Sequence, residues 1–164
     1  MKTTKKIIGV LSIALIFSCG SSENPKNPDN SNENMKANAN IVSIDTIRAV
    51  GNTMSEMSFN IKEINVKEGS LVKITLVNDG MDKSMIHNIV FIEQESADKV
   101  AFECQMAGEE NDFVVKNKVL AYSPLAYPGE TVSFEFRAPK KGNYRYFCTY
   151  PGHSDKMQGW LYVE

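Results

Sequence analysis

The feature that most constrains this chain is a ten-residue stretch near its C-terminus. Residues 148–157 read CTYPGHSDKM and bring together the thiol of Cys148, the imidazole of His153 and the thioether of Met157. The Pro-Gly pair between them is a turn signal, so the stretch can fold back and direct all three side chains at one point. Soft sulfur ligands with imidazole favour copper, and a trigonal Cys/His/His set with a weak axial Met is the blue-copper electron-transfer geometry.

Such a site needs a second histidine. The sequence contains only two, and the other is His87, much earlier in the chain. We therefore predict one type 1 copper ion held by His87, Cys148 and His153 in the plane, with Met157 as the axial ligand. The alternative is a β-hairpin with an incidental thiol and imidazole. Zinc is the rival metal, but Met is a poor zinc ligand, and the haem motif Cys-x-x-Cys-His is absent.

Three stretches carry a resemblance to a known family. Residues 147–154 (FCTYPGHS), followed by residues 157–159 (MQG), resemble the copper loop of azurin, a cupredoxin. Residues 85–88 (MIHN) resemble the segment that supplies the first histidine of azurin, and residues 57–60 (MSFN) resemble its second strand. The likeness covers residues 41–164. It implies a blue copper protein that carries single electrons.

The resemblance also assigns roles to neighbours of the ligands. The backbone carbonyl of Ile86 would lie opposite the axial Met as a distant fifth contact. Asn88 would tie the first-histidine segment to the copper loop by hydrogen bonds near Thr149. Backbone N–H groups of Asn88 and Tyr150 would donate to the cysteine sulfur and tune the metal. The alternative for Asn88 is a polar strand residue that faces solvent.

The hydrophobic pattern between residues 41 and 164 predicts an all-β domain. Strands are expected at residues 41–50, 57–66, 71–77, 85–92, 131–137, 143–148 and 159–163, with His87 near the start of the fourth. Short strands separated by turn signals are typical of a Greek-key β-sandwich, and the resemblance makes it cupredoxin-like. Residues 95–111 break the pattern at helical spacing, which predicts a short helical insertion. Within it, Cys104 is expected to pack as a small hydrophobe.

The N-terminal residues have the features of a bacterial lipoprotein signal. In residues 1–19, three lysines precede an apolar run too short to span a bilayer, and the small Ser18 precedes Cys19. Cleavage would leave Cys19 as the lipidated N-terminus. An ordinary cleaved signal with a chance cysteine is the alternative. Residues 20–40 hold seven Asn and almost nothing apolar, so we expect a flexible tether.

The net charge and the small number of histidines limit the functions that this chain can have. The chain carries a net charge of −2, and removing residues 1–19 leaves 15 basic and 20 acidic residues, which argues against nucleic acid as a partner. We expect an electron shuttle in the periplasm, anchored to a bacterial membrane through Cys19. Its partners would be redox proteins such as c-type cytochromes or copper/haem reductases. A periplasmic copper carrier or buffer is the alternative. Both histidines serve one site, so no catalytic centre is expected.

The resemblance further implies where electrons leave. The ring edge of His153 should reach the surface within an apolar patch that excludes water. The matching positions are Met57, Met85, Tyr150, Pro151 and Met106. The alternative is that these methionines fill the core.

Overall fold

The computed structural model describes residues 41–43, 46–94 and 97–164. The signal expected at residues 1–19 and the tether expected at residues 20–40 lie outside the described residues, so both stay predictions. In the part that is described, no helix is long and apolar enough to cross a membrane.

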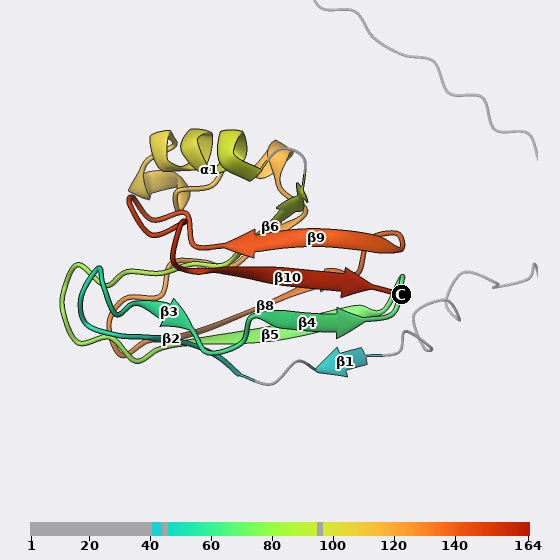
Figure 1. The fold of residues 1–164 in the computed structure, drawn as a ribbon, viewed down its shortest axis with the longest axis horizontal. Coiled ribbons are helices and arrows are strands. Elements are labelled where there is room, and N and C mark those ends of the chain that lie inside the picture. The colour runs from blue at the N-terminus through green and yellow to red at the C-terminus, as the bar shows by residue number, and fades with distance from the viewer. Residues whose placement is uncertain (1–40, 44–45, 95–96) are drawn as a thin grey trace, which may run out of the picture. The chain divides into compact units, whose positions relative to one another are not determined.

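Two five-stranded sheets lie face to face and form a sandwich (Figure 1). The first sheet contains β1 (Ile41–Ser43), β2 (Ile47–Val50), β3 (Ser58–Phe59), β5 (Leu71–Asn78) and β8 (Thr131–Arg137). At its centre, β5 pairs antiparallel with β8 on one side. On the other side it pairs in parallel with β1 along its first half and with β2 along its second.

The second sheet has the order β4-β10-β9-β6-β7. Its strands are β4 (Glu63–Val66), β6 (Val90–Glu93), β7 (Ala121–Tyr122), β9 (Gly142–Phe147) and β10 (Gln158–Val163). Only the β4–β10 pair is parallel, and the other pairs are antiparallel. The two mixed sheets confirm the expected all-β sandwich.

Several strand boundaries differ from the sequence prediction. The strand expected at residues 41–50 is two strands, and the one expected at residues 57–66 divides into β3 and β4, which belong to different sheets. The short β7 was not expected. The strand expected at residues 85–92 begins only at Val90, and His87 instead forms an isolated bridge with Ala126. The ladder is interrupted there because the N–H of Ile89 donates to the hydroxyl of Ser123.

The core lies between the two sheets and follows from the alternation within the strands. On β5, Val72, Ile74 and Leu76 are fully buried, and Leu161 of β10 faces them from the other sheet. Full burial of each such side chain contributes roughly 1.5–3 kcal/mol. The buried Tyr146 needs a partner for its hydroxyl, which donates to the carbonyl of Ile61 at 2.5 Å.

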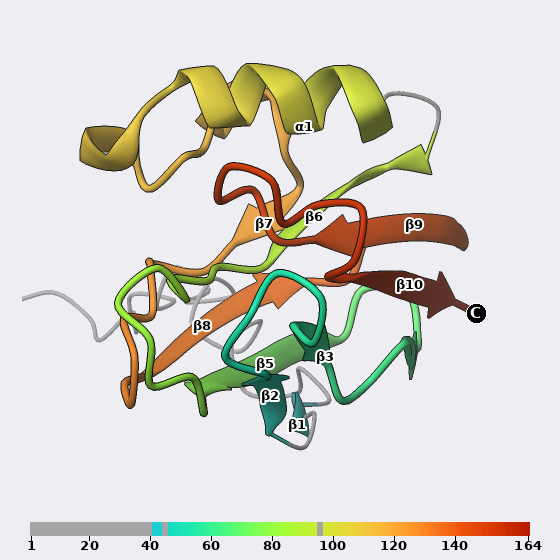
Figure 2. The ribbon, with the colours of Figure 1, turned by 60° about the vertical axis from the view of Figure 1, so that its left-hand side comes forward.

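The helical insertion covers the outer face of the second sheet (Figure 2). Helix α1 (Ala97–Met106) buries Ala97, Val100, Ala101 and Cys104 against Val90, Ile92 and Phe147. Two 3₁₀ turns follow, η2 (Glu109–Asn111) and η3 (Lys116–Lys118). The sulfur of Cys104 is fully buried and accepts a hydrogen bond from the N–H of Val115, so Cys104 does pack as a small hydrophobe.

The buried amide of Asn78 joins the loops at the end of the sandwich where His87 lies. Its Nδ2 donates to the carbonyls of Met85 at 2.6 Å and Ala126 at 2.9 Å, and its Oδ1 accepts from the N–H of Gly80 at 2.9 Å. Asn78 therefore fixes the segment that leads into His87 and the backbone that pairs with it.

We expect Asn78→Ala to lower the free energy of unfolding by about 3 kcal/mol, because buried backbone groups would lose their partners. Chemical denaturation of the metal-free protein measures this loss. Asn65→Ala is the matched control, since Asn65 is exposed on β4. An equal effect in both variants would contradict the role of Asn78.

Candidate metal centre

Three ligand-type side chains converge at one end of the sandwich. The β5–β6 connection carries His87, and the β9–β10 connection carries Cys148 and His153; Figure 1 shows both connections at the same end. The Sγ of Cys148 lies 3.9 Å from Nδ1 of His87 and 3.8 Å from Nδ1 of His153, and the two Nδ1 atoms are 3.2 Å apart. All three side chains are buried. The structure thus brings together the three residues that the sequence predicts as ligands.

This triangle has the size that a metal ion requires. Nitrogen and sulfur ligands lie about 2.0–2.3 Å from a first-row metal, so ligands spread around it in a plane are about 3–4 Å apart. Met157 is fully buried in the same cluster as Cys148, which adds a thioether to the donor set. Thiolate, two imidazoles and a thioether fit one type 1 copper ion.

Backbone hydrogen bonds close residues 148–157, here called the copper loop. The N–H of His153 donates to the carbonyl of Tyr150 at 3.0 Å, and the N–H of Met157 donates to the carbonyl of His153 at 2.9 Å. The N–H of Cys148 donates to the carbonyl of Met157, also at 2.9 Å. Gly152 has φ +81°, a conformation that glycine adopts without strain and that turns the chain back before His153. The protein itself therefore sets the spacing of the loop ligands.

Asn88 joins the two ligand-bearing segments. Its Oδ1 accepts from the N–H of Thr149 at 2.8 Å, and its Nδ2 donates to the hydroxyl of Thr149 at 2.7 Å. Both residues are fully buried, so the alternative of a solvent-facing Asn88 is wrong. Nδ2 also donates to the carbonyl of Asp112 at 2.8 Å. No sequence pattern predicts this third contact, because every residue type has a backbone carbonyl.

The surroundings of Cys148 govern its charge. Burial raises the pKa of the thiol to about 12, while hydrogen bonds from the backbone N–H groups of Asn88 and Tyr150 act in the opposite direction. Without a metal, the thiol therefore keeps its proton at neutral pH. A bound cation supplies the charge that an isolated buried thiolate lacks, and metal uptake releases the proton.

The two histidines are neutral and available as ligands. Burial lowers the pKa of His87 to about 3, with a further contribution from the nearby His153, and burial lowers the pKa of His153 to about 4. Neutral imidazole is the form that binds metals. The Nδ1 of His87 lies beside Sγ of Cys148 and Nδ1 of His153, so Nδ1 is the atom that the site uses. The Nε2 of His87 is buried and has no hydrogen-bond partner among the described residues.

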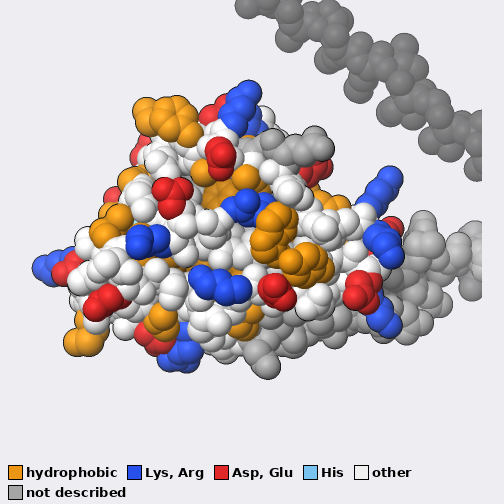
Figure 3. All heavy atoms as spheres, viewed as in Figure 1, with side chains coloured by type: hydrophobic (Ala, Val, Ile, Leu, Met, Phe, Trp, Pro, Cys, Tyr) orange, Lys and Arg blue, Asp and Glu red, His pale blue; other side chains and the backbone are white. Residues whose placement is uncertain are grey.

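The surface near the site differs from the expected patch. Met57 and Met85 are only 2% and 1% exposed and belong to the core, so the alternative of core filling holds for both. His153 is only 1% exposed, so the expectation that its ring edge reaches the surface is wrong. Figure 3 shows no histidine on the face that it views. Of the other positions expected in the patch, Pro151 and Met106 are exposed and Tyr150 is half-buried, and the patch itself stays a prediction.

Ile86 and Met54 complete the surroundings of the site. The side chain of Ile86 packs with Phe113 and Leu125, and the role of its carbonyl stays a prediction. Sequence reasoning missed Met54, which is half exposed and lies against Gly152 of the copper loop.

Comparisons with known proteins agree with this geometry. The family model "Copper binding proteins, plastocyanin/azurin family" matches residues 46–164. Auracyanin-A of Chloroflexus aurantiacus is 34% identical over 118 residues, which cover 70% of this chain and 72% of that protein. Its solved structure, described as that of a "blue" copper protein, has a TM-score of 0.67 at 33% identity and covers 76% of this chain and 99% of that one.

Two further relatives match at the same level of identity. Azurin of Alcaligenes faecalis is 34% identical over 111 residues, covering 63% of this chain and 87% of that protein. Outer membrane protein H.8 of Neisseria meningitidis serogroup B is 34% identical over 110 residues, covering 63% of this chain and 60% of that protein. With a family match over residues 46–164 and a ligand set that fits one type 1 copper ion, the chain belongs to the plastocyanin/azurin family of copper-binding proteins.

Proposed function

We propose that this protein is a blue copper electron carrier that serves periplasmic or membrane-associated redox partners. The observation that carries the proposal is the buried triangle of two Nδ1 atoms and the Sγ of Cys148, with Met157 in the same cluster. Copper in such a site cycles between Cu(I) and Cu(II) and so supplies one electron at a time. The chain supplies neutral imidazoles, a fixed loop and a pocket closed to water.

The residues around the ligands have positioning roles in this proposal. Asn88 and Thr149 hold the two ligand-bearing segments in register, and the N–H groups of Asn88 and Tyr150 stabilise negative charge on the Cys148 sulfur. Withdrawal of charge from the sulfur raises the reduction potential. The carbonyl of Ile86 is proposed as a distant contact opposite Met157.

A copper carrier or buffer is the second candidate. Such a protein must release its metal readily, which favours exposed ligands. Here His87, Cys148 and His153 are at most 1% exposed, and this burial favours the electron carrier. Incubation of the copper-loaded protein with a competing chelator distinguishes the two candidates. Negligible copper loss supports the role in electron transfer, and rapid copper loss supports the role as a copper carrier or buffer.

We further propose that the protein is lipid-anchored through Cys19 and faces the periplasm. The support is the lipobox-like sequence before Cys19 and the similarity to a relative named outer membrane protein H.8. Redox proteins such as c-type cytochromes or copper/haem reductases are the proposed partners. The protein is proposed to have no catalytic centre of its own, because both histidines belong to one site.

We expect the copper-loaded, oxidised protein to show an intense visible band from thiolate-to-copper charge transfer, and Cys148→Ser to abolish it. Absorption spectroscopy at matched copper content measures the band. Cys104→Ala is the matched control, because Cys104 is the other buried thiol among the described residues and lies on α1, where it packs against the second sheet. A colourless wild-type copper complex would contradict the assignment of Cys148 as the thiolate ligand.

Loss of the Met157 thioether should tune the site without destroying it. We expect Met157→Leu to bind copper with a higher reduction potential, since less electron donation reaches Cu(II). Voltammetry measures the potential. Met85→Leu is the control, because Met85 is an equally buried methionine outside the ligand set. An unchanged potential in Met157→Leu would place Met157 outside the site.

We expect Cys19→Ser to move the protein from the membrane fraction to the soluble fraction, because the lipid attachment point is lost. Immunoblots of fractionated cells measure the distribution, with Cys104→Ser as the control that stays at the membrane. A wild-type protein found already in the soluble fraction would show that residues 1–19 are an ordinary signal.

A further inference from the structure

Two consecutive residues next to the metal centre have left-handed backbone conformations. Asp112 has φ 55° and ψ 24°, and Phe113 has φ 52°. Among the described residues other than glycine, these two alone have positive φ. Asp tolerates this region, whereas for a bulky residue such as Phe it is a true outlier that costs about 1–2 kcal/mol. Such strain persists only where the surrounding structure enforces it.

The turn is held by backbone hydrogen bonds after α1. The N–H groups of Asp112 and Phe113 donate to the carbonyls of Glu109 and Gly108, each at 2.9 Å. The N–H of Val114 donates to the carbonyl of Asn111, also at 2.9 Å. The chain is thereby turned sharply between η2 and the segment that packs under α1.

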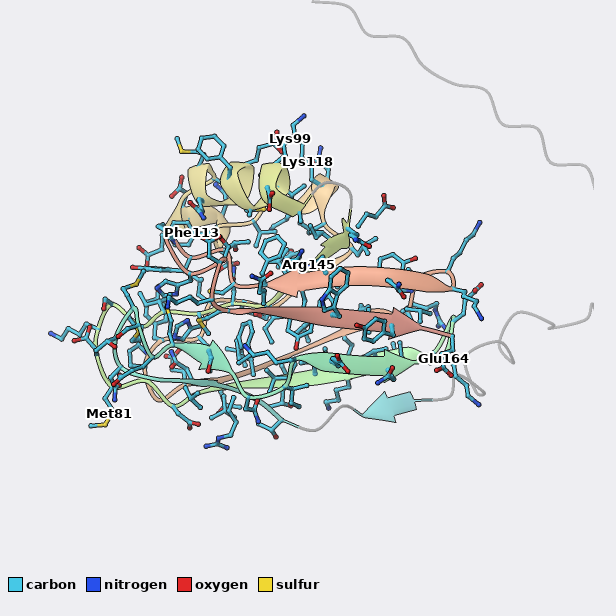
Figure 4. The ribbon with its side chains drawn as sticks, viewed as in Figure 1. Met81, Lys99, Phe113, Lys118, Arg145 and Glu164 are labelled. Atoms are coloured by element: carbon cyan, nitrogen blue, oxygen red, sulfur yellow. The ribbon has the colours of Figure 1, made fainter. Side chains whose placement is uncertain are left out.

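This turn directs two groups at the metal centre. The carbonyl of Asp112 accepts a hydrogen bond from Nδ2 of Asn88 at 2.8 Å. The ring of Phe113 meets the ring of Tyr150 edge-on, with 5.2 Å between centroids and 72° between planes. Tyr150 in turn lies against the ring of His153, with centroids 4.8 Å apart. Figure 4 shows Phe113 below the end of α1, at the end of the sandwich that carries the ligands.

The next residue faces the other way. Val114 is 3% exposed and packs with Val90 and Cys104 in the cluster beneath α1, whereas Phe113 packs with Ile86 and Leu125 beside the copper loop. Because of the left-handed pair, the side chain of Phe113 packs beside the metal centre and that of the following Val114 packs under the helix. A relaxed backbone at these positions would redirect the ring and the carbonyl.

We propose that Phe113 and the carbonyl of Asp112 position the two hydrogen-bond donors of the Cys148 thiolate. The carbonyl of Asp112 accepts a hydrogen bond from the side-chain amide of Asn88 and so holds the residue whose backbone N–H is one donor. The Phe113 ring holds Tyr150, whose backbone N–H is the other donor. This inference rests on the proposed function, and it assigns the tuning of that site to a turn outside both ligand-bearing segments.

The test variant is Phe113→Gly, which removes the ring and accepts the positive φ without strain. In the metal-free full chain, we expect faster hydrogen exchange at the Tyr150 amide, measured by NMR. In the copper-loaded protein, we expect a lower reduction potential, because a looser donor withdraws less charge from the sulfur. Phe113→Tyr keeps the ring and should retain wild-type values in both measurements.

Val114→Ala is the matched control, since it truncates a buried apolar side chain one residue away. It should lower the free energy of unfolding while leaving Tyr150 exchange and the potential unchanged. Phe113→Leu should fold even where Phe113→Gly does not, and it should show the same two changes at smaller size. Wild-type exchange and potential in the Phe113 variants, or equal changes in Val114→Ala, would overturn the positioning role.

The two measurements also separate this inference from the proposed function. Tyr150 exchange is read without copper, so faster exchange in Phe113→Gly supports the positioning contact even where no blue copper centre forms. A normal visible band together with unchanged exchange in Phe113→Gly would leave the proposed function intact and reject the inference.

Discussion

The paired hydrogen bonds between Asn88 and Thr149 are the interaction on which the metal centre depends. The two residues are 61 positions apart, and each follows a ligand directly, His87 in one case and Cys148 in the other. Because the bonds are buried, breaking them would leave the side-chain carbonyl of Asn88 and the backbone N–H of Thr149 without partners, at a cost of about 1–3 kcal/mol each. The distance between the first imidazole and the thiolate is thus set by protein hydrogen bonds.

The same burial disfavours charged forms of the three ligand side chains. It keeps both imidazoles neutral and the Cys148 thiol protonated at neutral pH. Neutral nitrogen lone pairs and a thiol that ionises only beside a cation form a pocket suited to a soft metal ion. The loop hydrogen bonds fix the ligands independently of that ion, so a change in the charge of the metal need not move them.

Much of the site could be predicted from the sequence because its chemistry is concentrated in side-chain identity. Two histidines, one of them within a Cys-x₄-His-x₃-Met loop, leave few alternatives. The fold class followed from alternation, but strand ends did not, because polar side chains such as Asn78 and Ser123 replace backbone partners. The burial of Met57 and Met85 was not predictable either, since a thioether suits a core and a surface equally.

What remained hidden from the sequence is the part of the site made by the backbone. Asp112 contributes a carbonyl and Phe113 an edge-on ring, both through a conformation that neither residue type prefers. A pattern of residue types does not encode a strained φ, and the strain exists only because α1, η2 and the copper loop together enforce it. The helical insertion therefore does more than cover the outer face of a sheet. It ends in a turn that reaches the amide of Asn88 and the ring of Tyr150, so changes in the insertion can alter the metal centre without touching a ligand.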